Sequence, residues 1–231
     1  MKLKYFFTAI LMTITGSMAA QDEVETSIGT DVVSQYVWRG FNMGDAALQP
    51  TLGVGYQGLS LSAWGSIGIT NPSDTKEFDL TLGYTAGAFN VGVTDYYFDT
   101  NKYFSYSAHN TSHVFEANVG YDFGCLNLQW FTNFAGDDGV NKSGKRAYSS
   151  YFQLTAPFKV GDVDWSATVG AVPYATSFYN ANGFAVTNIT LGASYTLVDK
   201  PQFELPIFAA ITANPRMEKA YFTIGISLKK K

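Results

Sequence analysis

The stretch that decides the fold class runs from Asp31 to Ile69 and reads DVVSQYVWRGFNMGDAALQPTLGVGYQGLSLSAWGSIGI. Apolar residues alternate in it with small or polar ones, and the alternation pauses between Arg39 and Ala47 and again at Gly58. A period of two places successive side chains on opposite faces of a β-strand, whereas an amphipathic helix needs apolar residues three and four positions apart. The stretch therefore predicts three strands, joined first by a longer loop and then by a tight turn.

The same alternation recurs along the rest of the chain, without a linker that would separate a second domain. It predicts twelve strands, at about residues 24–38, 48–57, 59–69, 78–86, 89–97, 115–123, 126–134, 148–158, 163–171, 189–197, 203–211 and 220–228. Short connections alternate with longer ones, which cover residues 39–47, 70–76, 99–112, 136–146 and 173–183. Short turns on one side and long loops on the other are typical of bacterial outer-membrane barrels.

The apolar faces of these strands carry a single charged residue, Asp95. A soluble β-protein would solvate its outer face with Lys and Glu and turn its apolar face inward. Since Arg or Lys at the middle of a bilayer costs roughly 2–4 kcal/mol, the pattern favours contact with lipid. We therefore predict an all-β transmembrane barrel, antiparallel and up-and-down, of about 12 strands. A soluble all-β protein is the alternative.

Aromatic residues gather at both ends of the predicted strands, where amphipathic rings are favoured at the lipid headgroups. The loop ends carry Trp38, Tyr97, Phe134 and Tyr148, and the turn ends carry Tyr56, Phe89, Phe123, Phe158 and Phe203. These two groups predict the two aromatic girdles of a membrane barrel.

Composition agrees with a membrane barrel. Charged residues make up 15% of the chain and aromatic residues 16%, against a usual charged share of roughly 25%. The net charge of −4 gives no support to nucleic-acid binding. The lone Cys125 cannot form an internal disulfide and is expected to be a small packing residue rather than a catalytic thiol.

The N-terminal segment has two lysines, an apolar run from Tyr5 to about Thr15, and small residues up to Ala20. This order predicts a secretory signal peptide over residues 1–20, because the apolar run is too short for a membrane helix. Residues 21–231 then form one barrel domain in the outer membrane of a Gram-negative bacterium. The expected partners are outer-membrane lipid, small hydrophilic solutes and the barrel-assembly machinery.

Three motifs resemble the TorF-type family of outer-membrane proteins. They are DVVSQYVWRG (Asp31–Gly40), PTLGVGYQGLSLSAWGS (Pro50–Ser66) and EFDLTLGYTAGAFNVGVTDYYF (Glu77–Phe98). The resemblance implies an outer-membrane barrel from a family designated as porins, and it identifies no catalytic residues. Such barrels usually carry a final aromatic residue that serves as the assembly signal. This sequence differs, because it has Leu228 followed by three lysines up to Lys231. Assembly through that usual signal is therefore in question.

The strand faces opposite the apolar ones would line the lumen, and acidic residues dominate them. Glu25, Asp31, Glu77, Asp79, Glu116, Asp122, Asp162, Asp164 and Glu204 stand against Arg39 and Lys219. The candidate pore-lining residues are Asp31, Arg39, Trp64, Glu77, Asp79, Glu116 and Lys219. Because an acidic wall favours cations, we predict a porin for passive diffusion of small solutes with a mild cation preference.

Two alternatives stay open for this lumen. The acids nearest the turns, Asp122, Asp162 and Glu204, can equally be solvated surface residues. Twelve strands fall between barrels that side chains fill and barrels that hold a channel. Glycines on the inward face either widen the lumen or permit the strands to coil.

The loop from Asp99 to Ser112 offers a function in binding. Tyr103, Phe104 and Tyr106 are candidate external-loop contacts to a sugar or a partner, in a non-conducting barrel for binding or adhesion. The same aromatic residues can instead fold inward as a plug.

The chain's two histidines, His109 and His113, lie beside serines in or next to this loop. A rim hydrolase needs a nucleophile, a base and a group that orients the base, and two nearby hydroxyls do not supply that arrangement. A spacing of four suits one face of a helix rather than a loop or strand, so no metal site is expected. We therefore expect no enzymatic activity and no cofactor.

Overall fold

The computed structural model describes residues 24–98, 102–107 and 111–231. The segment predicted as a signal peptide, residues 1–20, lies outside the described residues, and so does His109. No helix among the described residues is long and apolar enough to cross a membrane. The described strands are β1 (Glu25–Val33), β2 (Tyr36–Trp38), β3 (Phe41–Gly44), β4 (Ala47–Tyr56), β5 (Leu59–Gly68), β6 (Glu77–Ala86), β7 (Phe89–Tyr97), β8 (His113–Asp122), β9 (Asn127–Gly136), β10 (Ser150–Val160), β11 (Val163–Val172), β12 (Ala185–Asp199), β13 (Phe203–Asn214) and β14 (Lys219–Lys230).

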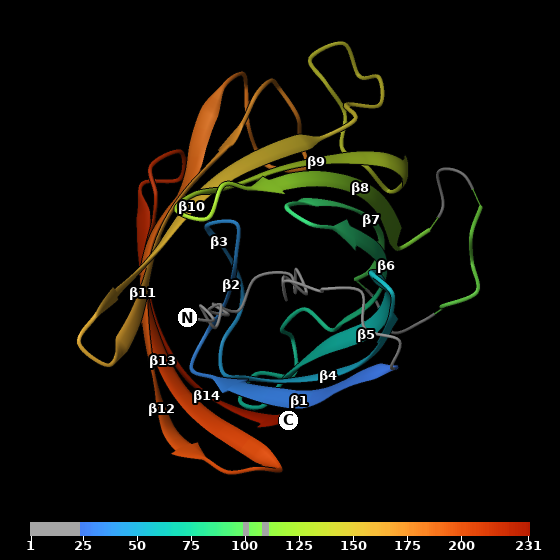
Figure 1. Cartoon of the computed structure of the whole chain (residues 1–231). Coiled ribbons are helices and arrows are strands. Elements are labelled where there is room, and N and C mark those ends of the chain that lie inside the picture. The colour runs from blue at the N-terminus through green and yellow to red at the C-terminus, as the bar shows by residue number, and fades with distance from the viewer. Residues whose placement is uncertain (1–23, 99–101, 108–110) are drawn as a thin grey trace.

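Twelve of these strands, β1 and β4 to β14, form a closed antiparallel barrel. Each strand pairs with its neighbours in the chain, and β1 closes the ring by pairing with β14 from Gly29↔Lys229 to Val33↔Gly225. The prediction of an all-β barrel with twelve strands is confirmed. The remaining strands, β2 and β3, pair only with each other and lie inside the ring (Figure 1).

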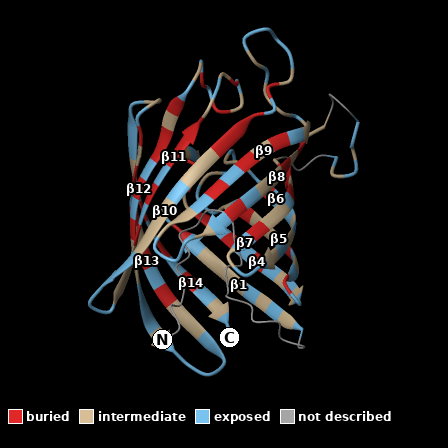
Figure 2. Ribbon diagram, turned by 45° about the horizontal axis from the view of Figure 1, so that its top comes forward, coloured by how far each residue is buried: buried red, intermediate tan, exposed pale blue. Residues whose placement is uncertain are grey.

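Burial alternates along most strands, so that exposed and buried residues follow one another (Figure 2). The exposed residues are the predicted apolar set, including Leu52, Leu61, Leu82, Ile211 and Phe222. The inward residues are mostly hydroxyl, amide, glycine and carboxylate groups. A continuous apolar outer wall of this extent would be unstable in water, because monomeric soluble proteins rarely expose large apolar patches. The wall therefore faces lipid, and the protein is an outer-membrane β-barrel.

The first part of the barrel sequence, from Asp31 to Ile69, contains two tight turns of the same kind. Gln57 and Gly58 connect β4 to β5, and both have positive φ, 49° and 86°. Arg39 and Gly40 connect β2 to β3, with φ of 49° and 85°. Two central residues in the left-handed region define the type I′ hairpin turn, whose twist matches that of the strands. The first turn was predicted, and the second converts part of a predicted loop into a hairpin.

The predicted first strand is wrong beyond Val33. The segment expected to run to Trp38 along the lipid leaves the barrel wall at Ser34, whose backbone N–H donates to the Ile224 carbonyl at 2.8 Å. Tyr36 and Trp38 are consequently buried inside the barrel instead of facing lipid. We call residues 34–46, which contain β2 and β3, the inward hairpin.

Cys125 also differs from expectation. It is exposed in the turn between β8 and β9 rather than packed in the wall.

Candidate functional site

The inward hairpin crosses the lumen and contacts the wall on several sides. The Tyr36 hydroxyl donates to Glu77 Oε2 on β6 at 2.8 Å. The Asn214 side-chain amide on β13 donates to the Gly40 carbonyl at 3.0 Å. Gly40 also approaches β12 so closely that a Cβ there would meet the Thr187 carbonyl. The tip of the hairpin therefore needs glycine, and it rests on β12 and β13, which follow β14 in the ring from β1.

Arg39, at the tip of the hairpin, is paired with Glu116 on β8. Its guanidinium donates from Nη1 to Oε2 at 2.6 Å and from Nη2 to Oε1 at 2.8 Å. The Tyr96 hydroxyl donates to Glu116 Oε1 at 2.8 Å, and Arg39 Nη1 donates to the Tyr179 hydroxyl. Arg39 is 1% exposed and Glu116 is 2% exposed. Such a two-point, fully buried pair fixes the hairpin's position and orientation.

Aromatic rings enclose the guanidinium. Its central carbon lies 4.2 Å from the ring centre of Phe131, 4.5 Å from Trp38 and 4.7 Å from Tyr151. Tyr179 contributes a fourth ring at 5.9 Å. Rings within about 6 Å of a cation attract it through their negative faces. We call Arg39, Glu116 and the rings around them the constriction cluster.

Tyr179 shows that a second loop folds into the barrel. It lies between β11 and β12 and stacks on Trp38, with ring centres 6.0 Å apart. Burial raises the pKa of the Tyr179 hydroxyl, so that this group stays neutral beside Arg39. The hairpin and this loop thus meet at the same level of the lumen.

Two further acidic residues lie on β6, two strands away from Glu116 on β8. Glu77 and Asp79 point inward from β6, and both are buried. Trp64 on β5 packs against Tyr36, with ring centres 5.6 Å apart, next to the hydrogen bond between Tyr36 and Glu77. The strands β6 to β8 therefore present three carboxyl groups towards the hairpin, of which Glu116 alone is paired with Arg39.

The structure brings together five of the seven candidate pore-lining residues. Arg39, Trp64, Glu77, Asp79 and Glu116 all lie at or beside the inward hairpin. Two others lie away from it: Asp31 is half-buried on β1 opposite Ser227, and Lys219 is exposed at the loop end of β14.

Residues 39–47 were predicted as one of the long loops, which would lie outside the membrane, and this is wrong because Arg39 is in the interior of the barrel. Sequence reasoning also missed the rings of Phe131, Tyr151 and Tyr179. The local signal for the hairpin was present in the motif Tyr36–Phe41, YVWRGF, which places aromatic residues on both sides of Arg-Gly.

Glycines on the inward face leave space that neighbouring side chains use. A Cβ on Gly170 would meet the Tyr151 hydroxyl, and a Cβ on Gly225 would meet the ring of Phe208. At these two positions the glycines do not widen the lumen, since the aromatic side chain of another strand lies across them.

Residues 102–107, which we call the aromatic loop, lie outside the ring of strands (Figure 1). The Tyr103 ring contacts the outward Phe78 of β6 at 5.7 Å and His113 of β8 at 5.1 Å, measured between ring centres. Phe104 is 87% exposed and Tyr106 is also exposed. The alternative of an inward plug is therefore wrong for the described residues 102–107. Tyr97, which was expected in the loop-end girdle, is buried beneath Tyr103.

This loop covers Asp95, the one charged residue that was predicted on the apolar face. His113 Nδ1 lies 2.7 Å from Asp95 Oδ1, and its Nε2 lies 2.5 Å from the Tyr103 carbonyl oxygen. His113 is fully buried by this packing. Asp95 is thus paired and screened from the lipid-facing surface, which explains how the wall tolerates it.

Replacing His113 by alanine should destabilise the barrel by about 1–3 kcal/mol, because the partly buried Asp95 carboxylate loses its partner. Urea unfolding of the refolded protein in lipid vesicles measures this change. Asp95→Asn in the same background should recover part of the loss. The single-channel conductance should stay unchanged, since neither side chain faces the lumen, and an altered conductance would contradict the placement.

The chain matches one family model and is similar to several solved structures. A family model described as "Bacterial protein of unknown function (Gcw_chp)" matches residues 17–218. Among solved structures, the NanC porin is similar at 13% identity and a TM-score of 0.47, covering 90% of this chain and 100% of that one. An outer-membrane channel from Pseudomonas putida F1 is similar at 11% identity and a TM-score of 0.38, covering 90% and 93%.

A porin refined at 1.8 Å is similar at 13% identity and a TM-score of 0.37, covering 90% of this chain and 99% of that one. A search of curated proteins finds no match to the sequence.

Proposed function

Because the chain belongs to the Gcw_chp family of bacterial proteins of unknown function, we propose its function from the barrel itself. The protein is an outer-membrane porin through which small hydrophilic solutes diffuse passively, past a constriction formed by the inward hairpin. The motifs shared with TorF-type proteins support this proposal, and membership of that narrower group is part of it.

The observation that carries the proposal is the contrast between the two sides of the wall. The outer side is apolar, whereas the inner side presents carboxyl, amide and hydroxyl groups from almost every strand. Polar groups of this kind support the proposal of a solvated passage, because a wall meant only to be packed would bury apolar residues more favourably. The hairpin narrows that passage, so the permeant solutes must be small.

Swelling of liposomes that contain the purified protein tests this function. A panel of sugars, amino acids and salts should permeate at rates that fall steeply with solute size. Failure of every solute, including the smallest ions, would favour the non-conducting barrel described below.

We further propose a mild cation preference, set by Glu77, Asp79 and Glu116 against Arg39 at the constriction. An acid-rich wall of low dielectric constant concentrates the field in the passage and favours cations.

The double variant Glu77→Gln/Asp79→Asn should move the zero-current potential in a KCl gradient towards that of a non-selective channel. Asp164→Asn is the matched control, because Asp164 lies at the turn end and pairs with Lys159 at 3.3 Å. A wild-type channel that prefers anions would overturn the charge assignment.

A second candidate function rests on the exposed aromatic loop. Phe104 and Tyr106 project from the outer rim, and the constriction cluster occupies much of the lumen. A barrel that conducts nothing and binds a saccharide or protein through this loop would explain both features. Phe104→Ser/Tyr106→Ser would then abolish binding to cells or glycans and leave liposome permeability unchanged.

Enzymatic activity is not part of the proposal. Both ring nitrogens of His113 are occupied, one by Asp95 and the other by the Tyr103 carbonyl, so this histidine is not placed to activate a serine. Export through residues 1–20 and insertion by the barrel-assembly machinery complete the proposed route to the outer membrane.

A further inference from the structure

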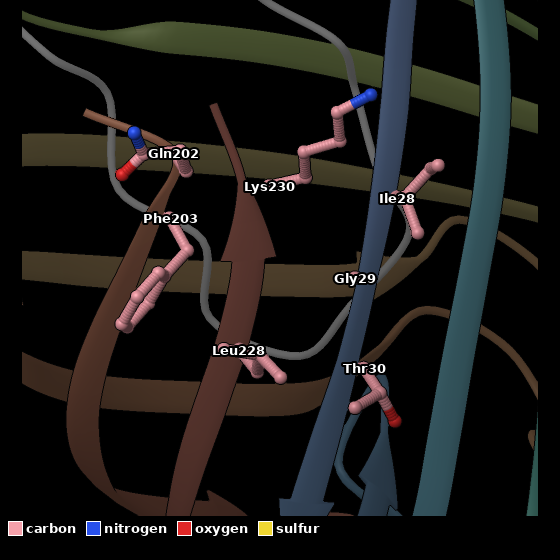
Figure 3. Close-up of a pocket in the computed structure, with 7 residues that line it drawn as sticks. All are labelled: Ile28, Gly29, Thr30, Gln202, Phe203, Leu228 and Lys230. Carbon is pink, nitrogen blue, oxygen red and sulfur yellow. The ribbon is translucent and has the colours of Figure 1, made fainter. Parts of the chain in front are cut away.

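A groove of about 500 Å³ opens on the outer face of the barrel at its turn end, where β1, β14 and β13 meet (Figure 3). Ile28 and Thr30 line it from β1, Leu228 and Lys230 from β14, and Phe203 from the start of β13. Its walls are almost entirely apolar. The groove therefore interrupts the lipid-facing surface at one place near the headgroups.

The strand pairing explains why the groove forms at this seam. β1 pairs with β14 only from Gly29 to Val33, although β1 begins at Glu25. The ladder between β13 and β14 is also interrupted, from the Glu204↔Lys229 pair to the Ile207↔Ile226 pair. Pro206 lies in this gap, and it has no backbone N–H to donate. This seam therefore has fewer strand pairs than the length of β1 allows.

The groove has a cation at its rim. Lys230 is exposed, and Figure 3 shows its side chain extending away from Leu228 and Phe203, at the edge of the groove. The adjacent Lys231 forms an ion pair with Asp199. Within residues 24–98, 102–107 and 111–231, none of the ion pairs involves Lys230. Its ammonium group is therefore available to an anion from outside the chain.

We propose that this groove binds one glycerophospholipid from the membrane leaflet at the turn end of the barrel. An acyl chain lies against Ile28, Leu228 and Phe203, and the phosphate pairs with Lys230. The two features match this single ligand: the apolar walls continue the lipid-facing surface, and the positive charge stands at the level of Phe203, a residue of the turn-end girdle. A second copy of the chain would present another apolar wall and would leave the ammonium unpaired.

Native mass spectrometry of the full barrel in a non-ionic detergent, titrated with phosphatidylglycerol, tests the proposal. The wild type should retain one phospholipid per barrel. Lys230→Gln should weaken retention about five-fold, since one basic residue near a lipid surface contributes about that factor. Thr30→Trp should abolish retention, because its ring fills the groove while Lys230 remains.

Lys159→Gln is the control, because it removes a cation at the same end of the barrel but away from the seam. It should bind like the wild type. Equal retention by Lys230→Gln, Thr30→Trp and the wild type would overturn the site. Equal retention of diacylglycerol, which lacks a phosphate, would overturn the role of Lys230, and a protein dimer in place of the lipid adduct would overturn the ligand.

Discussion

Removal of the inward hairpin should raise the single-channel conductance several-fold. The excision can be made without changing the register of the wall, because Val33 of β1 and Ala47 of β4 are direct partners. Replacing residues 34–46 with Asn-Gly joins them by a type I′ turn, which suits a two-residue hairpin. The variant loses the ring of Trp38, the Arg39 side chain and the tip that rests on β12 and β13, so the passage is no longer obstructed by the inward hairpin.

The matched control also replaces a segment with Asn-Gly, but in a loop outside the lumen. Residues 141–145 are suitable, because Val140 and Arg146 form a bridge that Asn-Gly can close. This control should conduct like the wild type. Circular dichroism and resistance to unfolding in detergent should show an intact barrel in both variants. A hairpin deletion that folds yet conducts no more than the wild type would mean that the passage is closed elsewhere.

The barrel wall could be predicted from the sequence because lipid imposes a simple rule. Most outward positions must be apolar, so the alternation around Leu52, Leu82 and Phe222 indicates directly which way each side chain points. The rule fails where a segment leaves the wall. Tyr36 and Trp38 are as suitable for a lumen plug as for a lipid girdle, and their alternation alone does not distinguish the two.

The candidate site was predictable only in part, for a similar reason. The inward register of Glu77, Asp79 and Glu116 follows from the strands that carry them. Their partners do not, because Arg39 and Tyr179 are separated by 140 positions and meet only after two loops fold into the same lumen. Asp95 was recognisable as an exception on the apolar face, but its pairing with His113 depends on the loop that lies over them.

The ion pair between Arg39 and Glu116 should contribute more to the stability of the barrel than the individual contacts of either residue suggest. Arg39→Met leaves a buried carboxylate without its cation and should destabilise the protein by about 3–5 kcal/mol. Glu116→Gln leaves a guanidinium that still has its ring contacts, each worth about 0.5–2 kcal/mol. The stability lost in Glu116→Gln should therefore be smaller than that lost in Arg39→Met.

The double variant Arg39→Met/Glu116→Gln should lose less stability than the sum of the two single losses, because neither charge is then left alone in the interior. Urea unfolding in vesicles supplies the four free energies of this cycle. Lys159→Met/Asp164→Asn provides the comparison: that pair is largely exposed, with side chains 58% and 35% accessible, and its coupling should not exceed about 1 kcal/mol.

Additive losses at Arg39 and Glu116 would mean that the hairpin is held by its aromatic contacts alone. Strong coupling would instead mean that the charge pair determines where the hairpin lies. In that case each single variant should also conduct more than the wild type, because the hairpin loses its fixed contact with β8. The same four proteins thus link the stability of the constriction cluster to the width of the passage.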